Sequence, residues 1–276
     1  MNGIDVNRKH TTLFNPGYTA LIYASEYGYL EIVKLLVNCK NIDVNTQSSH
    51  GHTALIRASR NGHADIVELL LEHEDINVNI CNKYKNTALI RACRNGHAEV
   101  VYLLLQCVGI NVNTNDYEGY SALIRSYNLE YFEIVKLLLQ SEGIYVDAKD
   151  DKNTTILIRA CQSGHADVVK SLLLCEGINI DIKDIHDNTA LIYALRNQYI
   201  QIVRMILQSG KLSYYDGYRT ELHCAIKTGN AKIVELLLQS EGVIVRSTDI
   251  GEQDTGKIRF LLLTHLKNRN QGLPHR

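Results

Sequence analysis

The residues of this sequence that could do chemistry are arginines at a fixed interval. Arg57, Arg91, Arg125 and Arg159 are 34 residues apart, and each follows a tetrad like the TALI of residues 87–90. A guanidinium group is permanently charged and binds carboxylates bidentately, so this pattern favours recognition of acidic groups. A second variable position, three residues further on, shares the same helix face. The candidate binding residues at the two positions are Arg57, Arg60, Arg91, Arg94, Arg125, Arg159, Tyr23, Tyr193 and Arg196.

Histidines and cysteines recur as well, which raises the question of a metal site. His63, His97 and His165 are spaced by multiples of 34 residues, each beside a glycine. Neighbouring helix pairs stand about 8–10 Å apart, whereas zinc needs ligands at about 2 Å, so we expect a structural role for these histidines. The seven cysteines contain no CxxC pair, and we expect them to be small core residues in a reducing compartment. We predict no metal and no cofactor.

Motifs for catalysis are absent from the sequence. It contains no GxSxG, P-loop, HExxH or GxGxxG pattern, and no EF-hand loop accompanies its turn aspartates. We therefore predict a protein without enzymatic activity and without a small-molecule substrate. The net charge of −1 over 276 residues provides no global field for nucleic acid or an acidic membrane, so electrostatic recognition would need local segregation of charge.

The elements that must position the arginines follow from the same repeat. Tetrads begin at residues 19, 53, 87, 121, 155, 189 and 220, which gives five steps of 34 and one of 31. In the second unit, Thr53 is a good helix N-cap, and Gly62 suits the left-handed residue that ends the helix. A second helix, ADIVELLLEH, is followed by an extended INVN segment and a polar turn. One such unit buries too little apolar surface to fold alone, so the units must stack.

These residues resemble the ankyrin repeat. The resemblance rests on GHADIVELLL following a TALI-like tetrad in seven units, and it implies an all-α ankyrin-repeat solenoid with short β-turn fingers. It also implies that the repeated histidine hydrogen-bonds between the helix pair and the loop. Units four and six depart from the pattern, with Glu130-Tyr131 and Gln198-Tyr199 in place of Gly-His. A non-glycine residue in a left-handed position costs about 1–2 kcal/mol.

The chain divides into three parts on this pattern. Residues 1–18 resemble the tail of a preceding repeat, residues 19–253 are seven ankyrin-type repeats, and residues 254–276 are a basic C-terminal capping helix and tail. Because no polar N-terminal cap is evident, self-association through that end is one expectation. No signal peptide or membrane-spanning run is visible, so we expect a cytoplasmic protein that does not act at a membrane.

The resemblance places the variable face of the first helix in a concave groove where partners bind. We therefore predict a protein–protein interaction scaffold whose arginines hold an acidic segment of a partner. Three alternatives stay open at this point. The arginines could instead pair internally with turn acids such as Asp116, Asp150 or Asp184; they could, as the less favoured case, bind nucleic acid; or the chain could be an effector of an intracellular microbe or virus acting in host cytoplasm.

Overall fold

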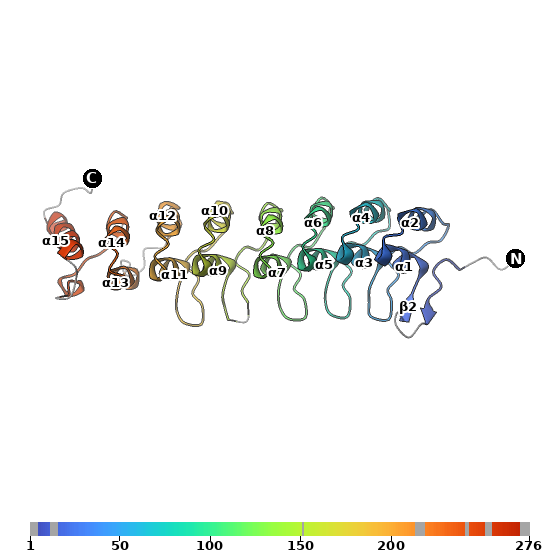
Figure 1. The fold of residues 1–276 in the computed structure, drawn as a ribbon, viewed down its shortest axis with the longest axis horizontal. Helices are drawn as coiled ribbons and strands as arrows, with labels where there is room; N and C mark the ends of the chain where they lie inside the picture. The colour runs from blue at the N-terminus through green and yellow to red at the C-terminus, as the bar shows by residue number, and fades with distance from the viewer. Residues whose placement is uncertain are drawn as a thin grey trace. The chain divides into compact units, whose positions relative to one another are not determined.

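The structure is a computed structural model that describes residues 5–11, 16–150, 152–212, 219–240, 243–251 and 256–270. It divides into two compact units, Met1–Tyr145 and Val146–Arg276. Within each unit, pairs of short antiparallel helices follow one another, and a long loop leads from each pair to the next (Figure 1). Among the described residues, no helix is long and apolar enough to cross a lipid bilayer.

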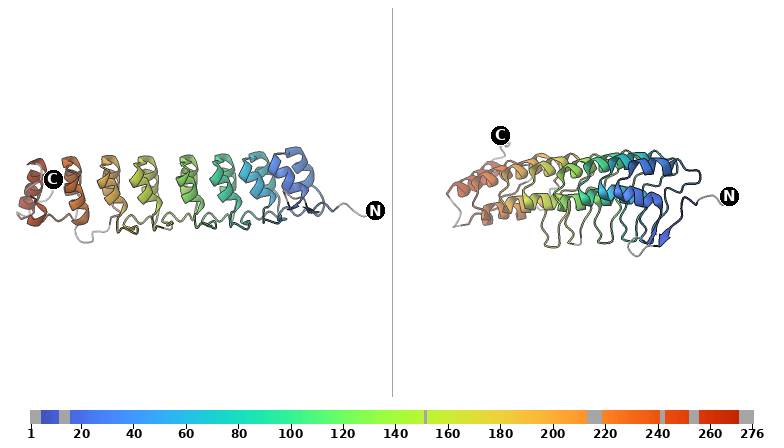
Figure 2. Two further views of the ribbon diagram at one scale, coloured as in Figure 1. Left: turned by 60° about the horizontal axis from the view of Figure 1, so that its bottom comes forward. Right: turned by 45° about the vertical axis from the view of Figure 1, so that its right-hand side comes forward.

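The described residues of the first unit form four helix pairs, and the pairs line up in two rows. We call the first helix of each pair the inner helix and the second the outer helix. The inner helices are α1 (Ala20–Tyr27), α3 (Ala54–Asn61), α5 (Ala88–Asn95) and α7 (Ala122–Asn128). The outer helices are α2 (Leu30–Val37), α4 (Ala64–Leu71), α6 (Ala98–Leu105) and α8 (Phe132–Leu139). Each helix packs on its counterpart in the next pair, and the long loops project from the row of inner helices (Figure 2). Strands β1 (His10–Thr11) and β2 (Pro16–Tyr18) form an antiparallel hairpin before α1.

The described residues of the second unit form three further pairs and a closing helix. Its inner helices are α9 (Ile156–Ser163), α11 (Ala190–Arg196) and α13 (Arg219–Lys227), and its outer helices are α10 (Ala166–Leu174), α12 (Ile200–Gln208) and α14 (Ala231–Leu238). The 3₁₀ turn η2 (Ser247–Asp249) precedes α15 (Gly256–Asn270), which packs against α14. The expected closing helix from Lys257 is therefore present. The short step between tetrads leaves α12 and α13 intact, and the loop between them includes residues 213–218, outside the described part.

The repeated tetrad begins an inner helix in each of the first six pairs. The side-chain oxygen of its Thr or Ser accepts a hydrogen bond from the backbone N–H three residues on, which confirms the predicted N-cap. The capping residues are Thr19, Thr53, Thr87, Ser121, Thr155 and Thr189. The seventh pair differs, because α13 begins at Arg219 and Thr220 therefore lies inside the helix.

Side chains from one repeat bond to the backbone of its neighbour. Nε2 of His63 lies 3.1 Å from the carbonyl oxygen of Glu26, and Nε2 of His97 lies 3.0 Å from that of Arg60. The repeated histidine therefore makes a structural hydrogen bond to the preceding helix pair. Below the helices, the side chain of Asn79 donates to the carbonyl of Gly109 and accepts from the N–H of Asn111 in the next loop. These contacts hold consecutive repeats in register.

The core consists of the repeated apolar positions, with one correction to the cysteines. Cys93 and Cys161 are fully buried in inner helices, as expected. Cys39 and Cys81 are exposed, so the prediction of a core role was wrong for these two. Both lie in connecting segments outside the helices.

The turn between paired helices needs a left-handed residue, as predicted. Gly62 ends α3 with a φ of 78°, and a Cβ there would lie 2.5 Å from the His97 ring. Glu130 and Gln198 occupy the same turn in their own repeats with φ values of 61° and 57°. Both side chains are exposed, so backbone strain is the main consequence of the missing glycine.

The strain at these two residues can be tested by replacement with glycine. We expect Glu130→Gly and Gln198→Gly each to raise the free energy of unfolding by up to about 1 kcal/mol, because relief of left-handed strain exceeds the entropy of the freer unfolded chain. Gly62→Ala is the opposite control and should destabilise. Urea denaturation measures all three; a loss of stability in both glycine variants would contradict this account.

Candidate partner-binding surface

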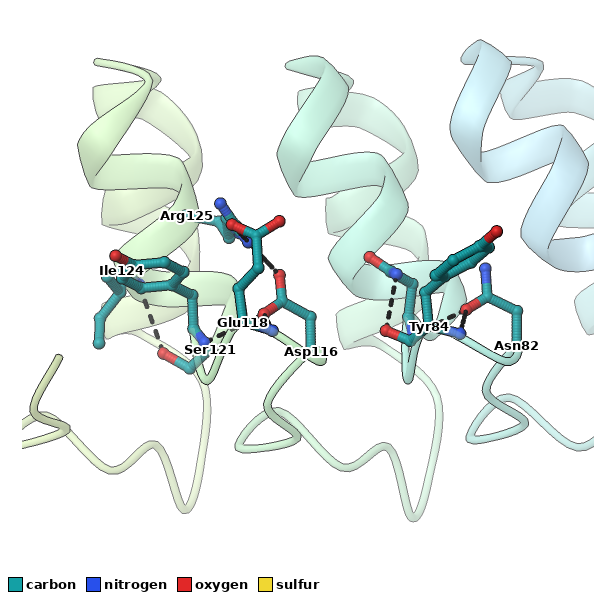
Figure 3. Close-up of polar contacts among 9 residues, drawn as sticks. Asn82, Tyr84, Asp116, Glu118, Ser121, Ile124 and Arg125 are labelled. Atoms are coloured by element: carbon teal, nitrogen blue, oxygen red, sulfur yellow. Dashed lines mark hydrogen bonds and ion pairs between the residues drawn. The ribbon is translucent and has the colours of Figure 1, made fainter. Parts of the chain in front are cut away.

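The best-defined arginine of the repeated series is Arg125 in α7. Its Nε donates to Oδ2 of Asp116 at 2.7 Å, and one Nη lies 2.6 Å from Asp116 and 2.7 Å from Glu118 (Figure 3). The Asp116 side chain is completely buried, and the guanidinium carbon lies 4.4 Å from the centre of the Tyr120 ring. Arg125 is therefore held by two carboxylates of the turn that leads into its own helix.

The turn orients the aspartate toward the arginine. Oδ1 of Asp116 accepts the backbone N–H groups of Glu118 and Tyr120, which leaves Oδ2 for Arg125. Asp150 has the same arrangement with Arg159, nine residues further on. Burial opposes ionisation of Asp150, but backbone N–H groups and Arg159 bring its pKa below the ordinary value. In both repeats, the carboxylate nine residues before the arginine therefore neutralises the charge of the guanidinium group.

Tyr193 and Arg57 are also engaged within the chain. The Tyr193 hydroxyl, which replaces the arginine in the sixth repeat, donates to Oδ2 of Asp184 at 2.6 Å. Arg57 has Ser48 nine residues before it and pairs instead with Glu26 of the preceding repeat at 3.0 Å. Its guanidinium carbon lies 5.3 Å from the centre of the Tyr18 ring. Internal pairing therefore holds for three of the four repeated arginines: Arg57, Arg125 and Arg159.

Arg91 in α5 is the exception. The residues in its turn that correspond to Asp116 and Glu118 are Asn82 and Tyr84, and both are neutral (Figure 3). Oδ1 of Asn82 accepts the same two backbone N–H groups as its aspartate counterpart, but its other polar atom is a nitrogen that contacts Nδ1 of His52 at 3.2 Å. Within the described part of the chain, Arg91 has no ion pair, which distinguishes it from the other three arginines. Its buried Nε has no hydrogen-bond partner there, and the same holds for Nε of Arg57.

The electrostatic surroundings of Arg91 are positive. Burial lowers the pKa of Arg91, and Arg60, Arg94 and Arg57 lower it further, opposed by Asp116. The pKa of His52 is lowered to about 3, first by burial and then by Arg57 and Arg91. We call Arg60, Arg91 and Arg94 the basic cluster.

The charges next to the basic cluster do not cancel it. Its two flanking arginines, Arg57 and Arg125, are held by three carboxylates: Glu26, Asp116 and Glu118. Among these five arginines and three carboxylates, positive charges therefore exceed negative charges by two. No group of three or more His, Cys, Asp or Glu residues that could hold a metal ion occurs among the described residues.

The remaining predicted residues are Tyr23 and Arg196. Tyr23 is half-exposed on α1, where its ring centre lies 4.6 Å from that of Tyr27. Arg196 is exposed at the end of α11 in the other unit. Sequence reasoning missed Asn82 and Tyr84, although a signal existed. Comparison of the residues nine positions before each repeated arginine shows serine, asparagine, aspartate and aspartate in order, and only the aspartates supply a local counter-charge.

Stacked helix pairs with a variable inner-helix face define a helical repeat protein. A family model described as ankyrin repeats in three copies matches residues 1–80, 75–150, 123–216 and 185–254. The chain therefore belongs to the ankyrin repeat family, which confirms the predicted fold. This family generally mediates protein–protein interaction and is generally not enzymatic.

Solved structures agree with the family assignment. The ankyrin repeat domain of Bcl-3, described as a unique member of the IkappaB protein family, is 25% identical, with a TM-score of 0.66 over 80% of this chain and 99% of that one. EF0377, an ankyrin repeat protein, is 26% identical, with a TM-score of 0.61 over 68% and 96% of the two chains. Comparison with curated proteins gives no match.

The contrast between paired and unpaired arginines predicts opposite effects of the same substitution. Arg125→Gln should lower the free energy of unfolding by about 1–3 kcal/mol, because the buried Asp116 carboxylate loses its partner. Arg91→Gln removes the same charge and should change stability by less than about 0.5 kcal/mol. Urea denaturation of both variants provides the measurement. An equal loss in the two would show that Arg91 has an internal partner after all.

Proposed function

We propose that this protein binds an acidic segment of a partner protein at the basic cluster of unit 1. The observation that carries the proposal is Arg91, which lacks the counter-charge that its own chain supplies to the corresponding arginines. A partner carboxylate at Arg91 would take the place that Asp116 and Glu118 occupy at Arg125. Guanidinium–carboxylate pairs of this kind are strong and directional.

The surroundings of Arg91 fit such a segment. Tyr84 is half-exposed on the same turn as Asn82, and its ring centre lies 6.1 Å from that of Tyr117. Exposed lysines flank Tyr84 at positions 83 and 85. An acidic peptide with a neighbouring apolar side chain would therefore find charge and an aromatic contact together. Arg57, Arg125, Arg159 and Tyr193 already have partners, so the proposal no longer includes them among the residues that bind directly.

Other functions and partners stay open to experiment. A nucleic acid could use the same three arginines, although its binding has no observation of its own in its favour. The effector role and the cytoplasmic location, in this cell or a host, stay proposals that the fold does not decide. Self-association through the N-terminal end concerns a different, apolar surface.

The proposal predicts that restoring the missing counter-charge weakens binding. Asn82→Asp combined with Tyr84→Glu rebuilds the turn of the fourth repeat next to Arg91, and His52 can adopt the tautomer that donates to the new carboxylate. Fluorescence anisotropy with a labelled poly-glutamate peptide at low ionic strength should show affinity at least about tenfold weaker than for the wild type. The thermal stability of the double variant should not fall.

Lys152→Glu is the matched control. Residue 152 corresponds to residue 84 in the fifth repeat, and the substitution changes the net charge by two units, as the double variant does. We expect Lys152→Glu to bind poly-glutamate as the wild type does. Equal weakening in both variants would show a nonspecific effect of net charge and would refute the basic cluster as the site. Tighter binding of a single-stranded oligonucleotide than of poly-glutamate would replace the protein partner with a nucleic acid.

A further inference from the structure

The fourth repeat shows which counter-ion the repeated arginine takes when its own turn supplies one. One Nη of Arg125 lies 2.6 Å from Oδ2 of Asp116 and 2.7 Å from Oε2 of Glu118. Two carboxylates of one turn therefore converge on a single guanidinium group. The hydrogen bond to Arg125 also lowers the pKa of Glu118, so both acids are ionised at neutral pH.

The third repeat lacks both of these negative charges. Asn82 and Tyr84 stand where the fourth repeat has its two acids, so Arg91 is deprived of two carboxylates and not of one. The neighbouring His52 does not change this count, because its pKa of about 3 keeps the ring neutral at neutral pH. A ligand that replaces the whole counter-ion of this position must bring about two negative charges.

The basic cluster is also compact. It consists of one arginine from α3 and two from α5, and these two inner helices pack against each other. At the second variable position, the inner helices on either side carry Glu26 and Asn128 in place of arginine. Glu118 adds an exposed carboxylate on the α7 side. A long run of acidic residues would extend beyond the two basic repeats toward these acids, whereas one strongly charged group fits within them.

We propose that the group held by the basic cluster is the phosphate of a phosphorylated residue in a partner protein. This inference rests on the proposed function and names the chemistry of the same site. A phosphomonoester carries about 1.5 to 2 negative charges near pH 7 and has three acceptor oxygens. One phosphorylated residue thus brings to Arg91 the charge that Asp116 and Glu118 together bring to Arg125. Arginine side chains bind phosphate bidentately, and clusters of them are a general means of recognising phosphorylated segments.

Three short labelled peptides of glycine and alanine test the proposal. They share a leucine beside the central residue and differ only at the centre, which is phosphoserine, glutamate or serine. Fluorescence anisotropy at low ionic strength should show the phosphoserine peptide binding at least about tenfold more tightly than the glutamate peptide, because it brings the second charge. Equal binding of these two peptides would overturn the phosphate inference and leave the acidic-segment proposal standing. So would poly-glutamate binding without phosphoserine binding.

The pH dependence of binding separates phosphate from carboxylate. The second pKa of phosphoserine is about 6 and the ordinary pKa of glutamate is about 4.3, so only phosphoserine loses charge between about pH 7.5 and about pH 5.5. The ratio of the two affinities should fall by up to about fourfold over that range. Changes in the protein affect both peptides and cancel in the ratio; the groups concerned are Arg57, Arg60, Arg94, Asp116, Glu118, His52 and the adjacent His50. A ratio independent of pH would overturn the proposal.

Arg91→Gln locates the phosphate. This variant should bind the phosphoserine peptide at least about tenfold more weakly than the wild type. Arg204→Gln is the matched control, because it removes the same charge from an exposed residue of the outer helix α12 and should bind as the wild type does. Should Arg91→Gln fail to fold, Arg94→Gln serves in its place, since Arg94 lies partly exposed in the last turn of α5. Equal weakening by the cluster variant and the control would refute the site.

Two further probes identify the source of the phosphate. Inorganic phosphate should displace the labelled phosphoserine peptide only at a concentration at least about tenfold higher than the unlabelled peptide requires, because it has no apolar side chain to contact Tyr84. Displacement at equal concentrations would replace the partner protein with free phosphate. A thymidine trinucleotide without a terminal phosphate carries two charges on separate phosphodiesters. Tighter binding of this trinucleotide than of the phosphoserine peptide would overturn the proposal in favour of nucleic acid.

Discussion

A helix pair of this length cannot bury its own apolar surface, so every repeat depends on its neighbours for stability. The repeated histidine, the loop asparagines and the small residues of the inner helices all serve that contact between repeats.

Each repeated arginine brings a positive charge that a nearby carboxylate can stabilise. Three of the four arginines have such a carboxylate within the chain, and Arg91 does not. Arg125 and Arg159 obtain a carboxylate from their own turn, and Arg57 obtains one from the preceding helix. At Arg91 the turn keeps its backbone hydrogen bonds through Asn82 while losing the negative charge. An asparagine thus keeps the hydrogen bonds that shape the turn but supplies no negative charge to the arginine. That difference leaves Arg91 without an ion pair in the described part of the chain.

Much of the fold was predictable from the sequence because its signals are local and repeated. The threonine caps, the left-handed glycines and their replacement at Glu130 and Gln198 all follow from residue type at a fixed spacing. The site was predictable only in part: the face bearing the arginines and the turn acids were named, but which arginine pairs with which acid depends on side-chain reach across a turn or a repeat. The prediction that Cys39 and Cys81 are core residues was wrong for a related reason, because residue type alone does not show whether a loop residue is buried by other parts of the chain.

Side-chain NMR of the arginine guanidinium groups tests the central claim most directly, with signals assigned by single Arg→Lys variants. Ion pairing slows rotation about the bond between Nε and the guanidinium carbon and protects the attached protons from exchange. The account predicts slow rotation and protection for Arg57, Arg125 and Arg159, together with fast rotation for Arg91 that slows when poly-glutamate is added. Equally slow rotation at all four arginines in the free protein would contradict it, because Arg91 would then already have a partner within the chain.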